Sequence, residues 1–394
     1  MVRKLTPPPK MNRRRFLITA ASGAAVVALG CHSDLQKQGQ AEAVPASEDL
    51  RLTLLRSAIR APNPHNAQPW IVELTGSNGI RLFVDRSRLL PFSDPFARQI
   101  HISQGCFLEL LELAARSSGY RAVITYFPEG EYANNTIDDR PVAAIELYAD
   151  PATLPDALFN EIPRRVSIKT PYQPNRILSP IDAATLETAS NSEGIQWRMI
   201  QEKTQLQTLA DLCKQAMAIE VASRDRDRET ARWFRFSDQE LAEKRDGFGL
   251  AQSGVFGARK WFAETFLLNR ERAEDPHGSF TSGAITLAGE QAATASAFAL
   301  LIGGKNTRLE QLRAGRAYAR VHLTAARLGL AMQPLSQLPE EYAEMAGVQR
   351  HMKEILSIPK NQTVQMLFRL GYAKPTPLSR RREVRSLLRQ TVAS

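Results

Sequence analysis

Cysteine is scarce in this chain of 394 residues, which contains only Cys31, Cys106 and Cys213. Three cysteines so far apart provide neither a disulfide framework nor the paired spacing of a metal site. Cys106 lies in the helical pattern "SQGCFLELLELAARSSGY", which favours a buried structural thiol over a reactive one. The six histidines also lack ligand spacing, and His322 falls within a helical pattern as a packing residue, so the sequence predicts no metal site.

Several catalytic motifs are missing as well. The chain has no G-x-S-x-G elbow, no G-x-x-x-x-G-K-[ST] loop, no H-E-x-x-H pair and no G-x-G-x-x-G fingerprint. It also has no internal repeat of the kind that builds solenoids. These absences set aside the corresponding hydrolase, nucleotide-binding, zinc-protease and repeat architectures.

Positive charge is concentrated at the two ends of the chain. The formal net charge is +10, and residues 1–31 carry six lysines or arginines with no acid. Residues 380–389 add five arginines against the single acid Glu383. Because the rest of the chain is close to neutral, we expect no nucleic-acid-binding face.

The first residues have the layout of an export signal. The apolar run Phe16–Gly30 has 15 residues, which is short of the roughly 20 needed to span a bilayer. A signal peptide over residues 1–31 is therefore favoured over a transmembrane helix. Arg13 and Arg14, followed after one residue by Phe-Leu, resemble the twin-arginine signal, which exports folded proteins.

The end of this signal resembles a lipoprotein cleavage box. The stretch "ALGC" would make Cys31 the acylated residue and a membrane tether, and ordinary signal-peptidase cleavage is the alternative. Either Met1 or Met11 can be the start. Residues 32–46 are small and polar, as in a flexible tether. We expect an exported protein, periplasmic or anchored to the membrane as a lipoprotein.

The body of the chain divides into two α+β units, over residues 47–154 and 155–394. In the first unit Ser47 caps a helix over 48–60, which Pro62 stops, and a second helix follows near 103–118. The predicted strands of this unit are "WIVELT" and "IRLFVDRS", joined by the turn "GSNG", and then "RAVITYF" and "VAAIELYAD".

The second unit has strand-like runs "IQWRMIQ", "SAFALLIGG" and "TVQMLFRLGY". Thr307 and Glu310 form a capping box for a helix that runs to Leu328, with Gly329 at its end. Residues 205–270 are helical in pattern and rich in aromatic residues, for which core packing is the simpler interpretation. These aromatic residues are Trp233, Phe234, Phe236, Phe248, Phe256, Trp261, Phe262 and Phe266.

Residues 60–70, "RAPNPHNAQPW", are unusual for a surface turn. Asn63, Asn66 and Gln68 offer carboxamides that both donate and accept hydrogen bonds, which suits the mixed edge of a heteroaromatic ring. Prolines at 62, 64 and 69 restrict the backbone that carries them. On these residues alone, a ligand site and an ordinary polar loop are equal alternatives.

A second stretch with chemical content is "RRVSIKTPY" at 164–172. If it is extended, alternation places Arg165, Ser167 and Lys169 on one side, where two cations and a hydroxyl would suit a phosphate. A solvated basic strand or the start of a helix is the alternative.

Both stretches resemble signatures of the nitroreductase family of flavoproteins, an α+β fold that binds FMN at a homodimer interface. Arg165, Ser167 and Lys169 match its R-x-S-x-[RK] segment, which holds the FMN phosphate and ribityl chain. Its A-P-S-x-x-N-x-Q-P-W segment contacts the isoalloxazine ring. The residues that match this second segment are Ala61, Pro62, Asn66, Gln68, Pro69 and Trp70. Asn63 stands where serine is usual, and it can still hydrogen-bond a flavin.

The resemblance implies two further contacts. Pro334, Leu335, Ser336 and Gln337 fall where the family places backbone amides beside flavin N5. Arg380, Arg381 and Arg382 fall where it places a last phosphate-binding cation, and which of them does so stays open. Lys169 is implied as the group that stabilises negative charge at N1 and O2 of the reduced flavin. No side-chain acid or base is assigned.

The order of the motifs is reversed relative to an ordinary family member, because the ring motif precedes the phosphate motif. This arrangement resembles the Acg-like branch, in which two nitroreductase-like halves are fused and one chain imitates the dimer. The segments 84–106, 312–340 and 365–382 are also similar to that branch. The implied architecture is an intrachain pseudo-dimer, and a monomer is expected.

The implied function is an FMN-dependent oxidoreductase that reduces small organic acceptors, nitroaromatic or quinone-like, by two electrons through flavin N5. The electron donor is open between NAD(P)H and a periplasmic donor, because NAD(P)H is not freely supplied outside the cytoplasm. The alternative is an FMN-sequestering protein with little turnover, in which the aromatic segment 233–266 closes as a lid over the flavin.

Overall fold

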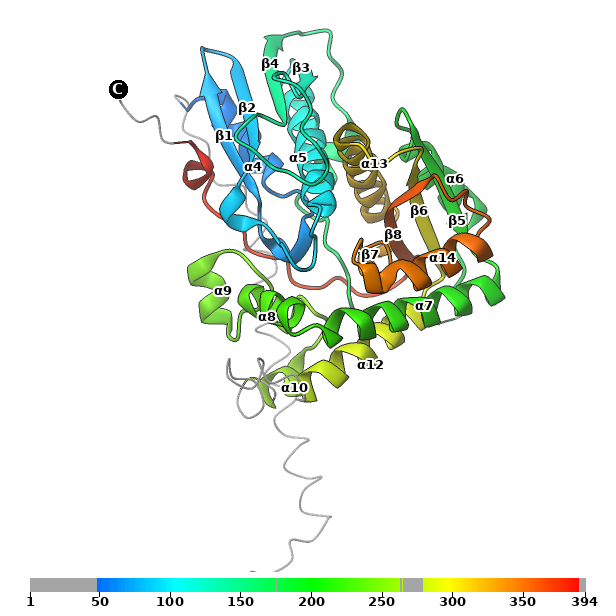
Figure 1. Ribbon diagram of the computed structural model, residues 1–394. Coiled ribbons are helices and arrows are strands. Elements are labelled where there is room, and N and C mark those ends of the chain that lie inside the picture. Colours follow the sequence, from blue (N-terminus) through cyan, green and yellow to red (C-terminus); the bar gives the residue numbers. More distant parts are fainter. Residues whose placement is uncertain (1–47, 175, 263, 265–278, 390–394) are drawn as a thin grey trace, which may run out of the picture. The chain divides into compact units, whose positions relative to one another are not determined.

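Eight strands of the described chain form two separate antiparallel sheets (Figure 1). The computed structural model describes residues 48–389 except 175, 263 and 265–278. The predicted signal peptide 1–31 with Cys31, the tether 32–46, the Ser47 cap and Phe266 lie outside these residues. No helix of the described part is long and apolar enough to cross a membrane.

The two sheets have the same strand order. The first is β1-β2-β4-β3 and the second is β5-β6-β8-β7, so each places its first, second, fourth and third strands side by side. The first sheet comprises β1 (Trp70–Thr75), β2 (Gly79–Val84), β3 (Tyr120–Tyr126) and β4 (Ala143–Ala149). The second comprises β5 (Ile195–Ile200), β6 (Ala297–Gly303), β7 (Ala331–Pro334) and β8 (Thr363–Gly371). The fold class is α+β, as predicted.

A long helix connects the second and third strands of each sheet. These helices, α5 (Arg98–Ser117) and α13 (Arg308–Arg327), have 20 residues each and pack against one another. They form the layer between the two sheets (Figure 1). Their apolar side chains share one core with both sheets, and α4 (Leu50–Ala58) packs against α5.

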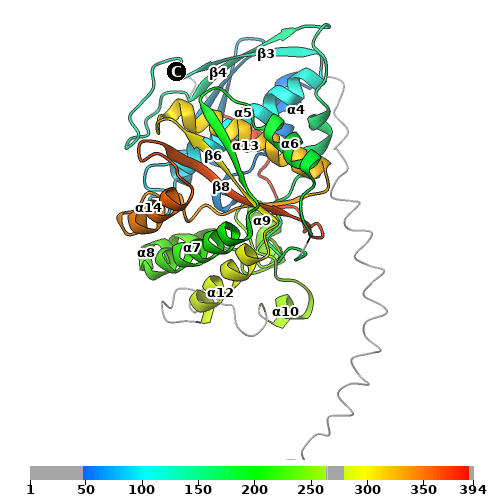
Figure 2. The same ribbon diagram turned by 90° about the vertical axis from the view of Figure 1, so that its right-hand side faces the viewer.

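The central strands β6 and β8 of the second sheet are buried on both faces, because helices cover the sheet on each side. In β6, Ala297, Ala299 and Leu301 join the core with α13, whereas Phe298, Leu300 and Ile302 join a second core. This second core includes side chains of α7 (Lys203–Ala222) and α14 (Ala346–Ile355). Figure 2 shows α7 and then α12 (Ser279–Ala293) beyond the second sheet.

The predicted helical stretch 205–270 is confirmed where it is described. Besides α7 it contains α8 (Arg224–Trp233), α9 (Asp238–Lys244) and α10 (Gly257–Phe262). Its aromatic residues do not form one core: Trp233 is buried, Phe234 and Phe248 line a cavity, and Trp261 is exposed. The other helices of the described residues are α6 (Pro180–Ala189) and the short 3-10 helices η1 (Pro64–Asn66), η2 (Arg86–Arg88), η3 (Ala157–Glu161), η5 (Ala343–Met345) and η6 (Val384–Leu387).

The boundaries of two helices differ from the expected ones. The first helix begins at Leu50, because Asp49 caps it by accepting from Arg51 N. The helix expected near 103–118 begins already at Arg98, because the carboxylate of Asp94 accepts from Gln99 N and Ile100 N. Strand β7 was not expected, since it has only four residues and ends in proline.

The C-terminal segment returns from the second sheet to the first. After β8 the chain crosses to β1, where Leu388 pairs with Val72 and Arg389 N donates to Val72 O at 2.7 Å. This crossing brings residues 379–382 into contact with the stretch 60–70, which lies near the other end of the described chain.

Candidate functional site

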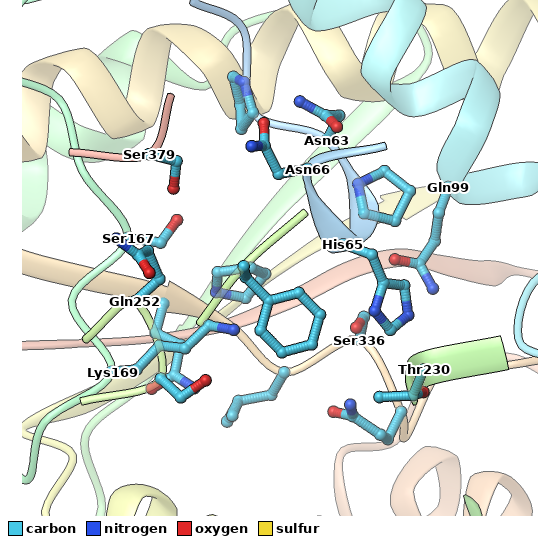
Figure 3. A pocket seen from close by; sticks show the side chains of 18 of the residues that line it. Asn63, His65, Asn66, Gln99, Ser167, Lys169, Thr230, Gln252, Ser336 and Ser379 are labelled. Atoms are coloured by element: carbon cyan, nitrogen blue, oxygen red, sulfur yellow. The ribbon is translucent and has the colours of Figure 1, made fainter. Parts of the chain in front are cut away.

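A cavity of about 880 Å³ lies where the two halves of the chain meet helices α7, α8 and α12 and the loop 248–255. Figure 3 shows polar side chains converging on it from different elements, among them Asn63, Ser167 and Lys169. This volume is in the range of sites for cofactors and drug-sized ligands. The cavity is therefore the candidate functional site.

Most of the residues predicted from the two motifs line this one cavity. They are Pro62, Asn63 and Asn66, Arg165, Ser167 and Lys169, Pro334, Leu335, Ser336 and Gln337, and Arg381. In the segment 164–169, Ile168 packs in a small core with Tyr172 and Ala331, and Arg165, Ser167 and Lys169 line the cavity. Val166 lines the cavity too, so it departs from the alternation expected of an extended segment. Gln68, Arg380 and Arg382 do not line the cavity.

Two arginine side chains meet at the backbone oxygen of a third arginine on the cavity wall. The backbone oxygen of Arg60 accepts from Arg165 Nη2 at 2.8 Å and from Arg381 Nη2 at 3.3 Å. All three residues line the cavity. Among the described residues, none of the three forms an ion pair with a carboxylate. Cations held together without a counterion are the arrangement that an anionic group completes.

The pKa values of the clustered arginines are also those of cations that lack a counterion. Burial lowers the pKa of Arg165 to about 10, although the side chain is still a cation at neutral pH. Burial also lowers the pKa of Arg381, and the neighbouring charges of Arg60 and Arg165 lower it further. The Nε of Arg165 is buried without a hydrogen-bond partner in the protein. The cluster therefore has both unbalanced charge and an unused donor.

Helix α13 supports Arg165 from behind. His322 Nδ1 lies 3.4 Å from Arg165 Nη1, and its Nε2 lies 3.2 Å from Val166 O. Burial, and the charge of Arg165 next to it, lower the pKa of His322 well below its ordinary value, so this imidazole is neutral. The predicted packing role of His322 thus includes orienting a cation of the candidate site.

Cys106 is a structural thiol, as expected. It is 1% exposed and donates to Gly315 O at 3.1 Å. Burial raises the pKa of this thiol far above its ordinary range, so it is not a nucleophile at neutral pH.

The backbone of the stretch 60–70 is held in an unusual conformation. His65, Asn66 and Gln68 have φ angles of 49°, 53° and 55°, in the left-handed region that non-glycine residues seldom adopt. Such residues cluster at functional sites, where surrounding contacts compensate for their cost. Here those contacts come from the carboxamides.

Both asparagines of this stretch make hydrogen bonds within the protein. Asn66 Nδ2 donates to Gly247 O at 2.9 Å and to Arg380 O at 3.0 Å, and its Oδ1 accepts from Arg381 at 2.7 Å. Asn63 Oδ1 accepts from Gln68 N at 2.8 Å. Their side chains therefore join three loops at the cavity, and a ring contact would have to share these hydrogen bonds.

Gln68 faces away from the cavity, toward the C-terminal segment. Its Oε1 accepts from Arg382 N at 2.8 Å, and its Nε2 donates to Arg245 O at 2.9 Å. Arg382 is held by Gln68 O and Trp70 O and by the charge of Asp85. Of the three candidate arginines at 380–382, only Arg381 reaches the cavity, because these contacts fix Arg382 elsewhere and Arg380 is exposed.

Lys169 lies in an aromatic part of the cavity. Its Nζ is 5.2 Å from the centre of the Phe248 ring, and the His65 ring is 5.5 Å from the same ring. Burial lowers the pKa of Lys169, and the charge of Glu220 partly offsets this. Burial, followed by the Lys169 charge, lowers the pKa of His65 to about 4. At neutral pH this part of the cavity thus holds a cation beside neutral rings.

A glycine lets the loop before α10 cross the Lys169 backbone. Gly254 has a φ of +93°, and a Cβ there would lie 3.0 Å from the carbonyl oxygen of Lys169. This crossing places Leu250, Gln252 and Ser253 on the cavity wall. The helical segment therefore covers the site with residues that have no counterpart in the two motifs.

Sequence reasoning missed four charged residues of the cavity, which are Arg60, Glu220, Arg226 and Asp227. Arg60 is the first residue of the stretch 60–70. Its position directly before Ala61 is the sequence feature that could have identified it as a cation of the site. Glu220 lies in the last turn of α7 and belongs to no motif. Only the packing of α7 on the rest of the chain places it in the cavity.

The comparable face of α13 does not line this cavity. Helix α5 lines the cavity with Gln99, Ile102, Ser103 and Cys106. Counted from the first residue of each helix, the equivalent positions of α13 are Leu309, Leu312, Arg313 and Arg316. Leu312 is instead buried among Phe127 and Tyr132, and Arg316 donates to Tyr126 and pairs with Glu109. First-half aromatic residues fill the space beside α13.

Comparison with known proteins gives the following matches. Residues 175–372, half of the chain, match the family described as "Nitroreductase family". A Mycobacterium tuberculosis H37Rv protein with the name "Putative NAD(P)H nitroreductase" is 27% identical over 356 residues, covering 86% of this chain and 91% of its own. An uncharacterized protein of the same organism is 43% identical over 75 residues, which is 18% of this chain and 22% of that protein.

Similar solved structures have low sequence identity to this chain, as two examples show. One is a Bacteroides fragilis nitroreductase with bound FMN, at 14% identity and a TM-score of 0.31, covering 56% of this chain and 89% of that chain. The other is an iodotyrosine deiodinase bound to FMN and 3-iodo-L-tyrosine, at 11% identity and a TM-score of 0.33. This match covers 57% of this chain and 95% of the deiodinase chain.

Proposed function

The chain belongs to the nitroreductase family, and from that premise we propose that it is an FMN-dependent oxidoreductase which reduces small organic acceptors by two electrons. The observation that carries this proposal is the cluster of Arg60, Arg165 and Arg381 in the wall of the 880 Å³ cavity. Three cations without a carboxylate partner in the described chain, one of them with an unused donor, fit the phosphate of FMN.

Other parts of the cavity fit the rest of the cofactor. Ser167 and Ser379 line the cavity near one another (Figure 3) and would hydrogen-bond the ribityl hydroxyls. The backbone of Pro334–Gln337 and the strained stretch 62–66 would border the ring, with Phe248 as an apolar wall. When bound, FMN supplies a carrier that takes up and passes on two electrons at N5.

The role of the protein is to bind this carrier and to set its electron affinity. Lys169 would stabilise the negative charge that develops at N1 and O2 on reduction, as a buried cation does for an oxyanion. Arg60, Arg165 and Arg381 would hold the phosphate and so fix the ring relative to Lys169. Phe234, Phe248 and α12 would restrict access of water and shape the space left for the acceptor.

The identity of the donor and the acceptor follows less directly. A relative carries NAD(P)H in its name, so NADH and NADPH are the first donors to test. Nitroaromatic and quinone-like compounds are the acceptors of choice, because the cavity offers aromatic walls beside Lys169. If the twin-arginine-like signal at 1–31 exports the folded protein, a periplasmic donor takes the place of the nicotinamide.

One observation favours the second candidate, an FMN-sequestering protein with little turnover. Phe234, Phe248 and the loop 250–255 cover the cavity and could exclude any substrate from the ring. The two candidates differ in how bound flavin is reduced. Bleaching by NADH or NADPH supports the oxidoreductase, whereas bleaching only by dithionite supports sequestration.

The first test is the visible absorption spectrum of the purified full chain, followed by heat release and chromatographic identification of the cofactor. We expect one FMN per chain, since the space beside α13 is filled by Phe127 and Tyr132. A protein that remains colourless after incubation with FMN would refute the proposal.

A further inference from the structure

Glu220 is a buried carboxyl group in the wall of the candidate site that the binding of FMN does not use. It lies in the last turn of α7, is 9% exposed and lines the cavity. No lysine, arginine or histidine of the described chain forms an ion pair with it. A carboxyl group that is enclosed, unpaired and open to a ligand cavity needs an explanation.

Two hydrogen bonds position this carboxyl group. The hydroxyl of Tyr342 donates to Glu220 Oε2 at 3.4 Å, and the side chain of Gln337 also hydrogen-bonds to the carboxylate. Gln337 ends the segment Pro334–Gln337, which is proposed to border flavin N5. Glu220 is thereby held next to the place where an acceptor would receive electrons.

The charges around Glu220 oppose one another. Lys169 and Arg226 favour its ionised form, while Glu229 and Glu340 disfavour it. Burial is the largest effect and raises the pKa of Glu220 to about 7. The group can therefore hold or release a proton near neutral pH, which is the property required of a general acid.

We propose that Glu220 is a catalytic residue that donates a proton to the acceptor as it is reduced. This inference rests on the proposed function. For a quinone, the reduced cofactor would supply a hydride with its electron pair to one carbonyl oxygen, and the other carbonyl oxygen, which becomes an oxyanion, would take the Glu220 proton. One hydride and one proton together convert the quinone to the hydroquinone. Water then returns a proton to the Glu220 carboxylate.

The test uses the FMN-loaded full chain, reduced without oxygen and mixed with 1,4-benzoquinone over a range of pH. The wild-type rate should fall about tenfold for each pH unit above 7, because the acid form becomes scarce. In Glu220→Gln the rate should be lower than the wild-type rate by a factor of about 100 or more, and it should not depend on pH in this range. Glu187→Gln in α6 is the matched control, since Glu187 is exposed, forms no ion pair with the described residues and does not line the cavity.

Two further readouts separate catalysis from structure. Ferricyanide accepts electrons without a proton, so Glu220→Gln should oxidise with ferricyanide at the wild-type rate. In infrared difference spectra, a protonated carboxyl band that disappears near pH 7 should be present in the wild type and missing in Glu220→Gln.

Three results would count against the proposal. A Glu220→Gln protein that binds FMN and keeps the wild-type quinone rate and pH profile overturns the role of Glu220 and leaves the proposed function intact. Equal slowing with quinone and ferricyanide shows a structural effect and also overturns it. A wild-type chain that binds no FMN overturns the proposed function and this inference together.

Discussion

Gly105 of α5 and Gly315 of α13 make reciprocal contacts across the interface between the two halves. Each is the eighth residue of its helix. A Cβ on Gly105 would lie 2.0 Å from Leu312 O, and a Cβ on Gly315 would lie 1.9 Å from Ile102 O. Ile102 and Leu312 are in turn the fifth residues of the two helices. Such a reciprocal pattern is that of a twofold-symmetric dimer interface, here within one chain.

The reciprocal pattern extends to the start of both helices. Arg98 and Arg308 are the first residues, and both are almost fully buried. Arg98 donates to Pro339 O in the second half, whereas Arg308 donates to Asn134 O in the first half. Together with the identical strand order of the two sheets, these contacts support the proposal of two related halves.

The glycine crossing predicts a stability effect. Gly315→Ala should lower the free energy of unfolding by about 1–3 kcal/mol or more, because the added methyl group must push apart two backbones that cannot yield locally. Chemical denaturation would measure this. Gly347→Ala in α14 is the control: nothing lies within 4 Å of its Cβ position, so it should be neutral or slightly stabilising. Equal unfolding midpoints for both variants would contradict the close crossing.

The arginine cluster predicts selectivity for the phosphate of the cofactor. Arg60→Ala should weaken FMN binding by about tenfold or more, because a charged hydrogen bond contributes roughly 1.5–3 kcal/mol. Binding of riboflavin, which lacks the phosphate, should change little. Calorimetric titration of both ligands measures the difference. Arg380→Ala is the control, since Arg380 is exposed and outside the cavity. A similar loss for riboflavin and FMN would place the phosphate elsewhere.

Lys169 should raise the electron affinity of the flavin. Lys169→Ala removes a buried cation, so reduction should become harder and FMN should be retained less well. We expect a reduction potential lower by about 30 mV or more, which corresponds to ~1.4 kcal/mol for two electrons. A dye-coupled potentiometric titration gives the value, with exposed Lys374→Ala as control. Unchanged potential and retention would remove Lys169 from the site.

Asn66 should matter both for stability and for the flavin spectrum. Asn66→Ala removes three hydrogen bonds at a residue that is 8% exposed and leaves the carbonyls of Gly247 and Arg380 without these donors. The expected loss is about 2–3 kcal/mol, measured by denaturation, together with a shifted visible spectrum. Exposed Asn191→Ala should change neither quantity. A stable Asn66→Ala protein with an unaltered spectrum would refute this role.

Much of the local structure could be predicted from the sequence, because it depends on neighbouring residues. Alternation and turn residues located the hairpin of β1 and β2, and the capping box at Thr307 and Glu310 located α13. The spacing of Arg165, Ser167 and Lys169 predicted that their side chains share one site, and all three line the cavity. These features are set by φ/ψ preferences and by the period of side chains along the backbone.

The contacts between distant segments were decided by the tertiary structure alone. Arg381, and neither Arg380 nor Arg382, reaches the cavity because the returning C-terminal segment pairs with Gln68 and Val72, hundreds of residues earlier. Glu220 enters the site only through the packing of α7 against α12 and the second sheet. The sequence by itself determined the chemical groups and their local order, whereas burial and the closing of the chain on itself determined which of them share one cavity and which charges remain without partners.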